Sequence, residues 1–296
     1  MTSAPLTPDA AAPVLVAGPT SWNELVYVAE LPEPRPQTVF ADRHRATVGG
    51  TSAGKALNLR SLGRQVVLST LLGEDDEGRR VRAVLDGAGV DVRPRAAVPA
   101  TERHLNLMGS RGERLSFYLE LPMLEAGTID LDPRLREAIA TAPAVVVDLA
   151  DHARDVLREA ARQGRPVWCD VHDYDGTSPF HREFVEASDH LFLSDERLPG
   201  HRELMTQRVA AGARVVVCTH GARGATALTA QDGWIEVPAV RDVEVVDTNG
   251  AGDAFFTGFL DAHLRGAGTL EAMRAATRHA ARCVQSPDLA PAPLRG

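Results

Sequence analysis

The fold is decided by Asp247-Thr248-Asn249-Gly250-Ala251-Gly252-Asp253, which stands directly before an apolar run, Ala254 to Leu260. A valine-rich segment, Val243 to Val246, precedes it and predicts a strand, and the apolar run predicts a helix. The glycines leave backbone amides uncovered where that helix begins, and such amides with the positive end of a helix dipole form an anion site. Asp253 adds a carboxylate that can take a proton from a hydroxyl group. The stretch therefore indicates phosphoryl transfer from a nucleotide to an alcohol.

The longer run DTNGAGDAFFTGFL resembles the C-terminal signature of the PfkB, or ribokinase-like, carbohydrate kinases. The resemblance implies that Asp253 is the catalytic base that deprotonates the acceptor hydroxyl. It implies an anion hole around the transferred phosphoryl group, made by Gly250, Ala251 and Gly252. It also implies a cofactor-binding segment, Asp247, Thr248 and Asn249, with Asp247 near a cation or the phosphates. From the residues alone, the alternative is a plain strand–turn–helix connection that uses Asp253 as a helix N-terminal residue.

Length and composition are those of a soluble globular enzyme. The chain has 296 residues, 44% hydrophobic and 24% charged, with a net charge of −8 that gives no reason to expect nucleic acid or an anionic membrane as partner. It has no apolar stretch of transmembrane length and no signal-peptide pattern at its N-terminus. The three cysteines are scattered in apolar surroundings, which predicts reduced core cysteines. We therefore expect a cytoplasmic protein.

Apolar strands alternate with helical patterns along most of the chain, which predicts a largely parallel sheet covered on both faces. The predicted strands are Val14–Gly18, Gln65–Ser69, Ala144–Asp148, Pro166–Asp170, His190–Ser194 and Arg214–Cys218, and the clearest helices are Asp75–Gly87 and Ala153–Arg162. Two regions, Asn23 to Phe40 and Thr101 to Leu121, show β-like patterns without a helix. The second contains a hairpin with its turn at Gly109 to Glu113. These regions predict a small projecting sheet, which the resemblance identifies as a lid over the sugar and as a surface for forming a homodimer.

A second glycine motif, Gly49-Gly50-Thr51-Ser52-Ala53-Gly54-Lys55-Ala56, has two interpretations. It matches most of a P-loop, but Ala56 stands where Ser or Thr should bind Mg²⁺. The polar residues 40–47 also do not form the buried strand that a P-loop follows. The motif resembles instead the N-terminal signature of the same kinases, in which the glycine pair lets the backbone approach the sugar.

The substrate residues follow from that second resemblance, with two departures from the family pattern. Gly54 stands where the family usually has an Asn that contacts a substrate hydroxyl, so Lys55 or Asn58 is expected to supply that contact. Lys55 is the only lysine of the chain. A solvated lysine in the first helical turn is the equally ranked alternative for it. Asn23 stands where the family often has an Asp that accepts hydrogen bonds from sugar hydroxyls. The predicted substrate set is thus Asn23, Gly49, Gly50, Lys55 and Asn58.

Cofactor residues are implied at two more places. Thr219-His220-Gly221-Ala222-Arg223-Gly224 resembles the family's nucleotide loop, so Thr219, Gly221 and Gly224 are expected to bind ATP. The family's Asn-x-x-Glu motif for Mg²⁺ is replaced by Ser194-Asp195-Glu196-Arg197, and Asp195 and Glu196 are the expected metal ligands. A monovalent cation such as K⁺ near Asp247 is a further expectation. His201 and His279 are interpreted as ordinary surface or helix residues.

The sequence therefore predicts a ribokinase-like three-layer α/β/α sandwich, with a mainly parallel central sheet and a small β-sheet lid. The kinase domain is expected over 13–290, with lid segments at about 23–45 and 100–122 and a disordered tail over 1–12. The expected activity is ATP-dependent phosphorylation of a small-molecule sugar. The alternatives are a nucleoside kinase, a phosphosugar kinase that would use Lys55, Arg103 and His104, a non-catalytic sugar or nucleotide sensor, and a P-loop NTPase.

Overall fold

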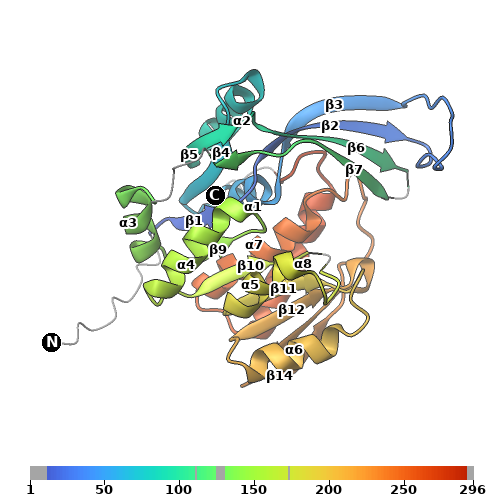
Figure 1. The fold of residues 1–296 in the computed structure, drawn as a ribbon. Helices are drawn as coiled ribbons and strands as arrows, with labels where there is room; N and C mark the ends of the chain where they lie inside the picture. Colours follow the sequence, from blue (N-terminus) through green and yellow to red (C-terminus); the bar gives the residue numbers. More distant parts are fainter. Residues whose placement is uncertain (1–11, 111, 125–130, 173, 292–296) are drawn as a thin grey trace.

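The large sheet forms the centre of the protein and carries helices on both faces (Figure 1). The computed structural model describes residues 12–110, 112–124, 131–172 and 174–291. The strands are β1 Val14–Ala17, β2 Ser21–Val28, β3 Arg43–Gly49, β4 Val66–Leu72, β5 Asp91–Val98, β6 Glu102–Gly109, β7 Arg114–Glu120, β8 Met123–Leu124, β9 Val145–Val147, β10 Val167–Asp170, β11 His190–Ser194, β12 Val215–Thr219, β13 Ala225–Thr229 and β14 Gly233–Val237. The helices are α1 Thr51–Ser61, α2 Asp76–Gly87, α3 Pro133–Thr141, α4 Arg154–Arg162, α5 Pro179–Ala187, α6 His201–Ala210, α7 Ala251–Leu264 and α8 Thr269–Val284, with short 3-10 turns at Asp151–Ala153 and Gly221–Arg223.

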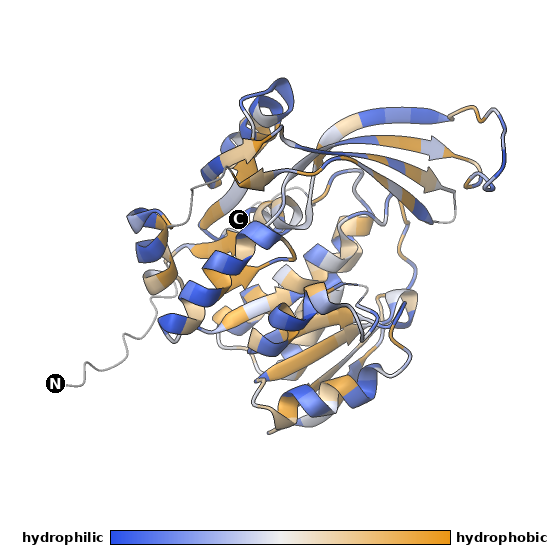
Figure 2. Cartoon of the chain, in the orientation of Figure 1, coloured by the Kyte–Doolittle hydropathy of each residue, from blue (hydrophilic) through white to orange (hydrophobic). Residues whose placement is uncertain are grey.

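The order of the large sheet is β14-β13-β12-β11-β10-β9-β1-β4-β5-β8. Neighbours from β12 to β5 run parallel, and antiparallel pairs form its two edges. Successive side chains of a strand point to opposite faces. In β1, Val14 and Val16 pack with α1, α2, α7 and α8, whereas Leu15 and Ala17 pack with α3 to α6. Figure 2 shows the resulting apolar centre between helices whose outer surfaces are hydrophilic. The predicted three-layer α/β fold is confirmed.

A second sheet, which we call the lid, has the order β3-β2-β6-β7 and extends away from the layered body (Figure 1). The predicted hairpin is present as β6 and β7, which pair antiparallel. β2 lies between β3 and β6, antiparallel to the first and parallel to the second. Its burial alternates, because one face of the lid packs inward and the other meets solvent.

Two predictions about elements need correction. Residues 29–42 form no strand, and β3 occupies the polar stretch that follows them. The expected strand over Val243 to Val246 is wrong: these residues are assigned no strand, and they pair with none of the strands in the described part of the chain. Val245 and Val246 are exposed, and the Val246 amide donates instead to the Val284 carbonyl at the end of α8.

Most of the predicted tail, residues 1–12, lies outside the described residues, so its expected disorder stays a prediction. Cys169, Cys218 and Cys283 are buried free thiols, as predicted. Among the described residues, no helix is long and apolar enough to cross a membrane.

Candidate active site

The N-terminus of α7 has the geometry of an anion site. Gly250 precedes the helix with φ +82°, a left-handed conformation that favours glycine. Within the described residues, the amides of Gly250, Gly252 and Asp253 have no hydrogen-bond acceptor, whereas the Ala251 amide donates to the Thr248 carbonyl at 3.2 Å. Two of the three residues of the predicted anion hole thus present unused donors beside the positive end of the helix.

Asp253 lies in the first turn of α7, and its carboxylate is buried against Lys55 of α1. Lys55 Nζ is 3.0 Å from Asp253 Oδ1, an ion pair without hydrogen-bond geometry. The same ammonium donates to Asp148 Oδ1 at 2.7 Å and lies 3.9 Å from Asp170 Oδ2. Lys55 is completely buried, and its ammonium lies among three carboxylates. Asp148 follows β9, Asp170 ends β10, and Asp253 follows residues 247–250, which we call the anion loop.

The charges of this cluster depend on one another. Burial raises the pKa of Asp253, while the ammonium of Lys55 opposes that rise. Burial would lower the pKa of Lys55, but Asp148, Asp253 and Asp170 together hold it above its ordinary value. For Asp170, burial is outweighed by His172 and Lys55, and its pKa is lowered. Lys55 is therefore a permanent cation, and Asp253 accepts a proton more readily than Asp170 does.

Gly54 leaves the space that the Asp253 carboxylate occupies. A Cβ atom at Gly54 would lie 2.4 Å from Asp253 Oδ2, far inside van der Waals contact. Because glycine replaces the family's Asn here, the backbone of helix α1 can lie directly against the Asp253 carboxylate. The position makes room for the Asp253 side chain and is not itself a polar contact.

The lid holds the anion loop from the other side. Tyr27 Oη of β2 donates to Asp247 Oδ2 at 2.7 Å, and Arg45 of β3 lies 3.8 Å from the same oxygen. Arg114 of β7 donates to Asn249 Oδ1 at 3.2 Å. Asp247 in turn accepts the Asn249 amide at 2.9 Å, which fixes the start of the loop. The Asp247 carboxylate is thus already paired with the Arg45 guanidinium and the Tyr27 hydroxyl, both from the lid.

The other predicted substrate residues form the connection between lid and body. A Cβ at Gly49 would overlap the Asn23 side chain, and one at Gly50, with φ +86°, would meet the Pro19 carbonyl at 2.5 Å. Asn23 Oδ1 accepts from Ser21 at 2.7 Å. Asn58 is fully buried and donates to the carbonyls of Gly54 and Leu289, so it ties α1 to the C-terminal segment. Asn23, Gly49 and Gly50 thus lie together, and Asn58 lies apart from them in the core.

The predicted nucleotide loop follows β12. Gly224 has φ +107°, and a Cβ there would meet the Val237 carbonyl at 2.1 Å, which requires glycine. Asp195, at the end of β11, accepts from His220 at 2.9 Å and from Arg223 at 2.6 Å. Burial alone would raise the pKa of Asp195, yet these two hydrogen bonds hold it below its ordinary value. Asp195 is therefore occupied by hydrogen-bond donors of the protein, while Glu196 beside it is exposed.

Several expectations are corrected by this geometry. Lys55 is not a solvated lysine, and its burial among carboxylates also excludes a P-loop role. Lys55, Arg103 and His104 do not form a cation cluster, because His104 pairs with Glu102 at 2.8 Å and Lys55 is committed to the core. His279 is buried, not a surface residue. Asp148 and Asp170 were missed, although an acidic residue at the carboxyl end of an apolar strand is a signal that could have found them.

Comparisons with known proteins show the family of the chain. The profile described as pfkB family carbohydrate kinase matches residues 14–294. The chain is 33% identical to the acarbose 7(IV)-phosphotransferase of an Actinoplanes species, over 86% of this chain and 85% of that protein. It is 30% identical to the ATP-dependent ribose-1-phosphate kinase of Halopiger xanaduensis, over 83% of each chain. The solved structure of the microbiome-derived acarbose kinase Mak1 superposes with a TM-score of 0.81 at 30% identity, covering 93% of each chain.

An Arabidopsis thaliana ribokinase solved with ribose and ATP shares the fold, with a TM-score of 0.80 at 24% identity over 95% of this chain and 96% of that one. The family implies the use of ATP and a hydroxyl group as the phosphoryl acceptor. With the family profile spanning nearly the whole chain, the protein belongs to the PfkB family of carbohydrate kinases.

Proposed function

We propose that the protein transfers the γ-phosphoryl group of ATP to a hydroxyl group of a sugar, with Asp253 as the general base. The observation that carries this proposal is a buried carboxylate of raised pKa in the first turn of α7, beside amides of Gly250 and Gly252 that have no acceptor among the described residues. A base must be able to take a proton, and the transferred group must meet fixed donors where its charge develops. The N-terminus of α7 supplies both.

In the proposed reaction, Asp253 removes the proton of the attacking hydroxyl as its oxygen bonds to the γ-phosphorus and the bond to ADP breaks. The amides of Gly250 and Gly252 stabilise the phosphoryl oxygens, and Ala251 shapes the turn between them. The other phosphates and the ribose would lie along Thr219, Gly221 and Gly224, with Thr248 and Asn249 opposite. Lys55 offsets part of the negative charge of Asp148 and Asp170 around the base throughout.

The residues predicted to bind Mg²⁺ and a monovalent cation differ in how well they could hold these ions. Mg²⁺ would neutralise charge on the phosphates, but Asp195 fits it poorly because Arg223 and His220 already occupy its carboxylate. Glu196, with phosphate oxygens and waters, remains the proposed protein ligand. A monovalent cation at Asp247 fits poorly as well, since the Arg45 guanidinium already lies beside that carboxylate.

The acceptor would lie between the lid and the body, against Asn23, Gly49 and Gly50. The names of the relatives set the panel to be tested: acarbose, ribose 1-phosphate, nucleosides and fructoselysine, together with free pentoses and hexoses. The two acarbose kinases are the reason to place acarbose first. Nucleosides are the second class, because a nucleoside kinase of Methanothermobacter thermautotrophicus is 28% identical over 86% of this chain.

The test is ADP release from Mg-ATP across this panel, repeated with Asp253→Asn. The amide keeps the shape of the side chain but cannot accept the proton, so turnover on the best acceptor should fall by about 10²–10⁴-fold while ATP binding persists. The matched control is Asp261→Asn, which removes a carboxylate of similar burial at the other end of α7, where it pairs with Arg64. Unchanged turnover in Asp253→Asn, or an equal loss in the control, refutes the assignment of the base.

A further inference from the structure

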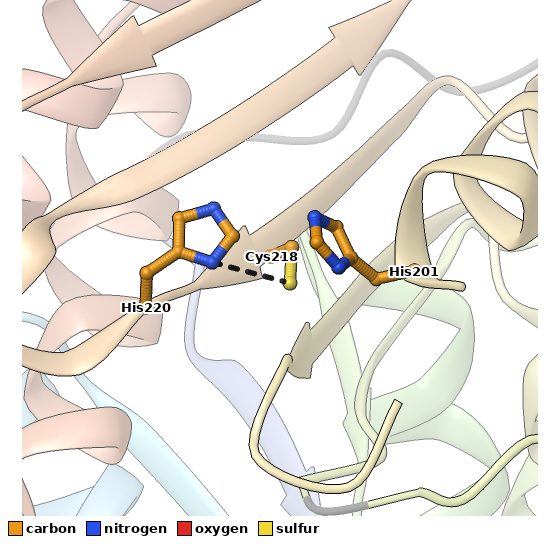
Figure 3. Close-up of side chains that lie close together, drawn as sticks. All are labelled: His201, Cys218 and His220. Carbon is orange, nitrogen blue, oxygen red and sulfur yellow. Dashed lines mark hydrogen bonds between the residues drawn. The ribbon is translucent and has the colours of Figure 1, made fainter. Parts of the chain in front are cut away.

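A cluster of His201, Cys218 and His220 lies outside the chemistry described above. Cys218 and His220 are two residues apart at the end of β12, so their side chains leave the strand on the same side. His201 is the first residue of α6 and comes from a different part of the chain. Figure 3 shows the two imidazole rings on either side of the Cys218 sulfur. One ligand atom from each residue lies within 4.8 Å of the others.

The distances are close to those of a metal site. Cys218 Sγ and His220 Nδ1 are 3.9 Å apart. Tetrahedral Zn²⁺ with its usual bond lengths sets sulfur and nitrogen ligands about 3.5 Å apart, so this pair needs to close by only a few tenths of an ångström. The rings of His201 and His220 have centroids 5.2 Å apart and are tilted by 56°, so they are near enough for one ion to bind both.

The hydrogen bonds around the cluster are those expected of metal ligands. His220 Nε2 contacts Thr226 Oγ1 at 2.9 Å, which fixes the ring and leaves Nδ1 directed toward Cys218 and Asp195. An outer partner of this kind typically orients a metal-binding histidine. His201 Nδ1 is buried without a hydrogen-bond partner among the described residues. Buried polar atoms are normally hydrogen-bonded, and an ion bound here would give this nitrogen the partner that it lacks.

We propose that His201, Cys218 and His220 bind one thiophilic divalent cation, with Zn²⁺ the best match, and that Asp195 or water completes the tetrahedron. Thiolate and imidazole ligands favour Zn²⁺ over Mg²⁺, so this site is distinct from the magnesium of the kinase reaction. Binding displaces the proton of the Cys218 thiol to solvent, and the ring proton of His220 resides on Nε2, facing Thr226, so that Nδ1 can bind the ion.

Arg223 is the group that opposes a cation here, because it pairs with Asp195. Its side chain is 71% exposed, so it can turn into solvent when the ion neutralises that carboxylate. A nucleophilic role for Cys218 is less consistent with its surroundings, since burial raises the pKa of the thiol to about 12. Binding would join α6 to the end of β12 and hold the loop 221–224 that follows.

The experiment measures metal binding by the tag-free full chain, without any need for kinase activity. The protein is stripped with a chelator and titrated with Zn²⁺ against a chromophoric competitor, and a parallel sample is loaded with Co²⁺ for its absorption spectrum. One equivalent of Zn²⁺ and a thiolate-to-Co²⁺ charge-transfer band are expected. In Cys218→Ser the Zn²⁺ affinity should fall at least about 100-fold and the band should vanish.

The matched control is Cys169→Ser, which alters another buried free thiol, on β10, outside the cluster. It should keep both the stoichiometry and the band. If Cys218→Ser does not fold, His201→Gln and Thr226→Val test the same site, and both should weaken Zn²⁺ binding by about 10-fold or more. Substoichiometric Zn²⁺ in the wild type, or binding that survives loss of Cys218 or His201, overturns the proposal.

Discussion

Replacing Lys55 by methionine removes the one cation buried among Asp148, Asp170 and Asp253 while keeping a side chain of similar length. At 3.0 Å and an effective dielectric constant of about 20, the attraction between Lys55 and Asp253 is worth about 5 kcal/mol before desolvation is counted. Desolvation of the ions offsets most of that gain in the wild type. Without the ammonium, the carboxylates are left uncompensated, and the free energy of unfolding should fall by about 3–5 kcal/mol at pH about 8.

The pH dependence identifies the cause of that loss. Without Lys55 the buried carboxylates take up protons more readily in the folded state than in the unfolded chain. The folded variant then binds more protons, so its stability increases as pH falls. Urea unfolding should show a Lys55→Met penalty at pH about 5 that is smaller than the penalty at pH about 8 by more than about 1 kcal/mol.

Two further variants make the test specific. Arg64→Met breaks an ion pair of 2.7 Å with Asp261, but Arg265 still neutralises that carboxylate, so its cost should be smaller and independent of pH in this range. Adding Asp148→Asn to Lys55→Met should recover at least about 1 kcal/mol, because the two residues are directly coupled. A Lys55→Met cost below about 1 kcal/mol at pH about 8, or one that is equal at both pH values, would refute the reasoning.

Three other changes test separate parts of the site. Gly54→Ala should lower kcat by about 10–100-fold, because its Cβ displaces the Asp253 carboxylate, the proposed base, whereas Gly87→Ala, with no atom in its way, should leave kcat unchanged. Tyr27→Phe leaves buried Asp247 with one hydrogen bond fewer and should lower the free energy of unfolding by about 1–3 kcal/mol, measured with urea. Burial lowers the pKa of His279 to about 4, so below pH about 6.5 the unfolded chain binds more protons than the folded one, and the free energy of unfolding decreases as the pH is lowered. His279→Gln should reduce that acid-induced loss by about 3 kcal/mol. An unchanged dependence of stability on pH would contradict this.

The central layer was predictable because its strands are short apolar runs buried on both faces. Val145–Val147 is an example: three consecutive valines with no alternation belong to a parallel strand covered by helices on both sides. The lid hairpin was predictable from its turn residues. The prediction of strands from apolar runs fails at Val243 to Val246, because a valine-rich sequence forms a strand only where a neighbouring strand can hydrogen-bond to it.

The surroundings of Lys55 could not be predicted from local sequence. Its partners Asp148 and Asp170 lie 93 and 115 residues away, and they meet it only because β9 and β10 are adjacent near the middle of the large sheet. A lysine in the first turn of a helix looks the same in sequence whether it points into solvent or into the core. What sequence did indicate was its uniqueness, as the single lysine among 32 basic residues.

The contacts made by the last described residues have a consequence for how the protein is synthesised. Leu289 accepts a hydrogen bond from Asn58 and lies against Gly250, and the Pro287 carbonyl accepts from Arg45. During translation, the central strands have all left the ribosome before this segment does. A nascent chain can therefore form its sheet early, but α1 and the anion loop receive their final support only after residues 287–289 have emerged. A released chain truncated after residue 285 should thus be folded and yet without turnover.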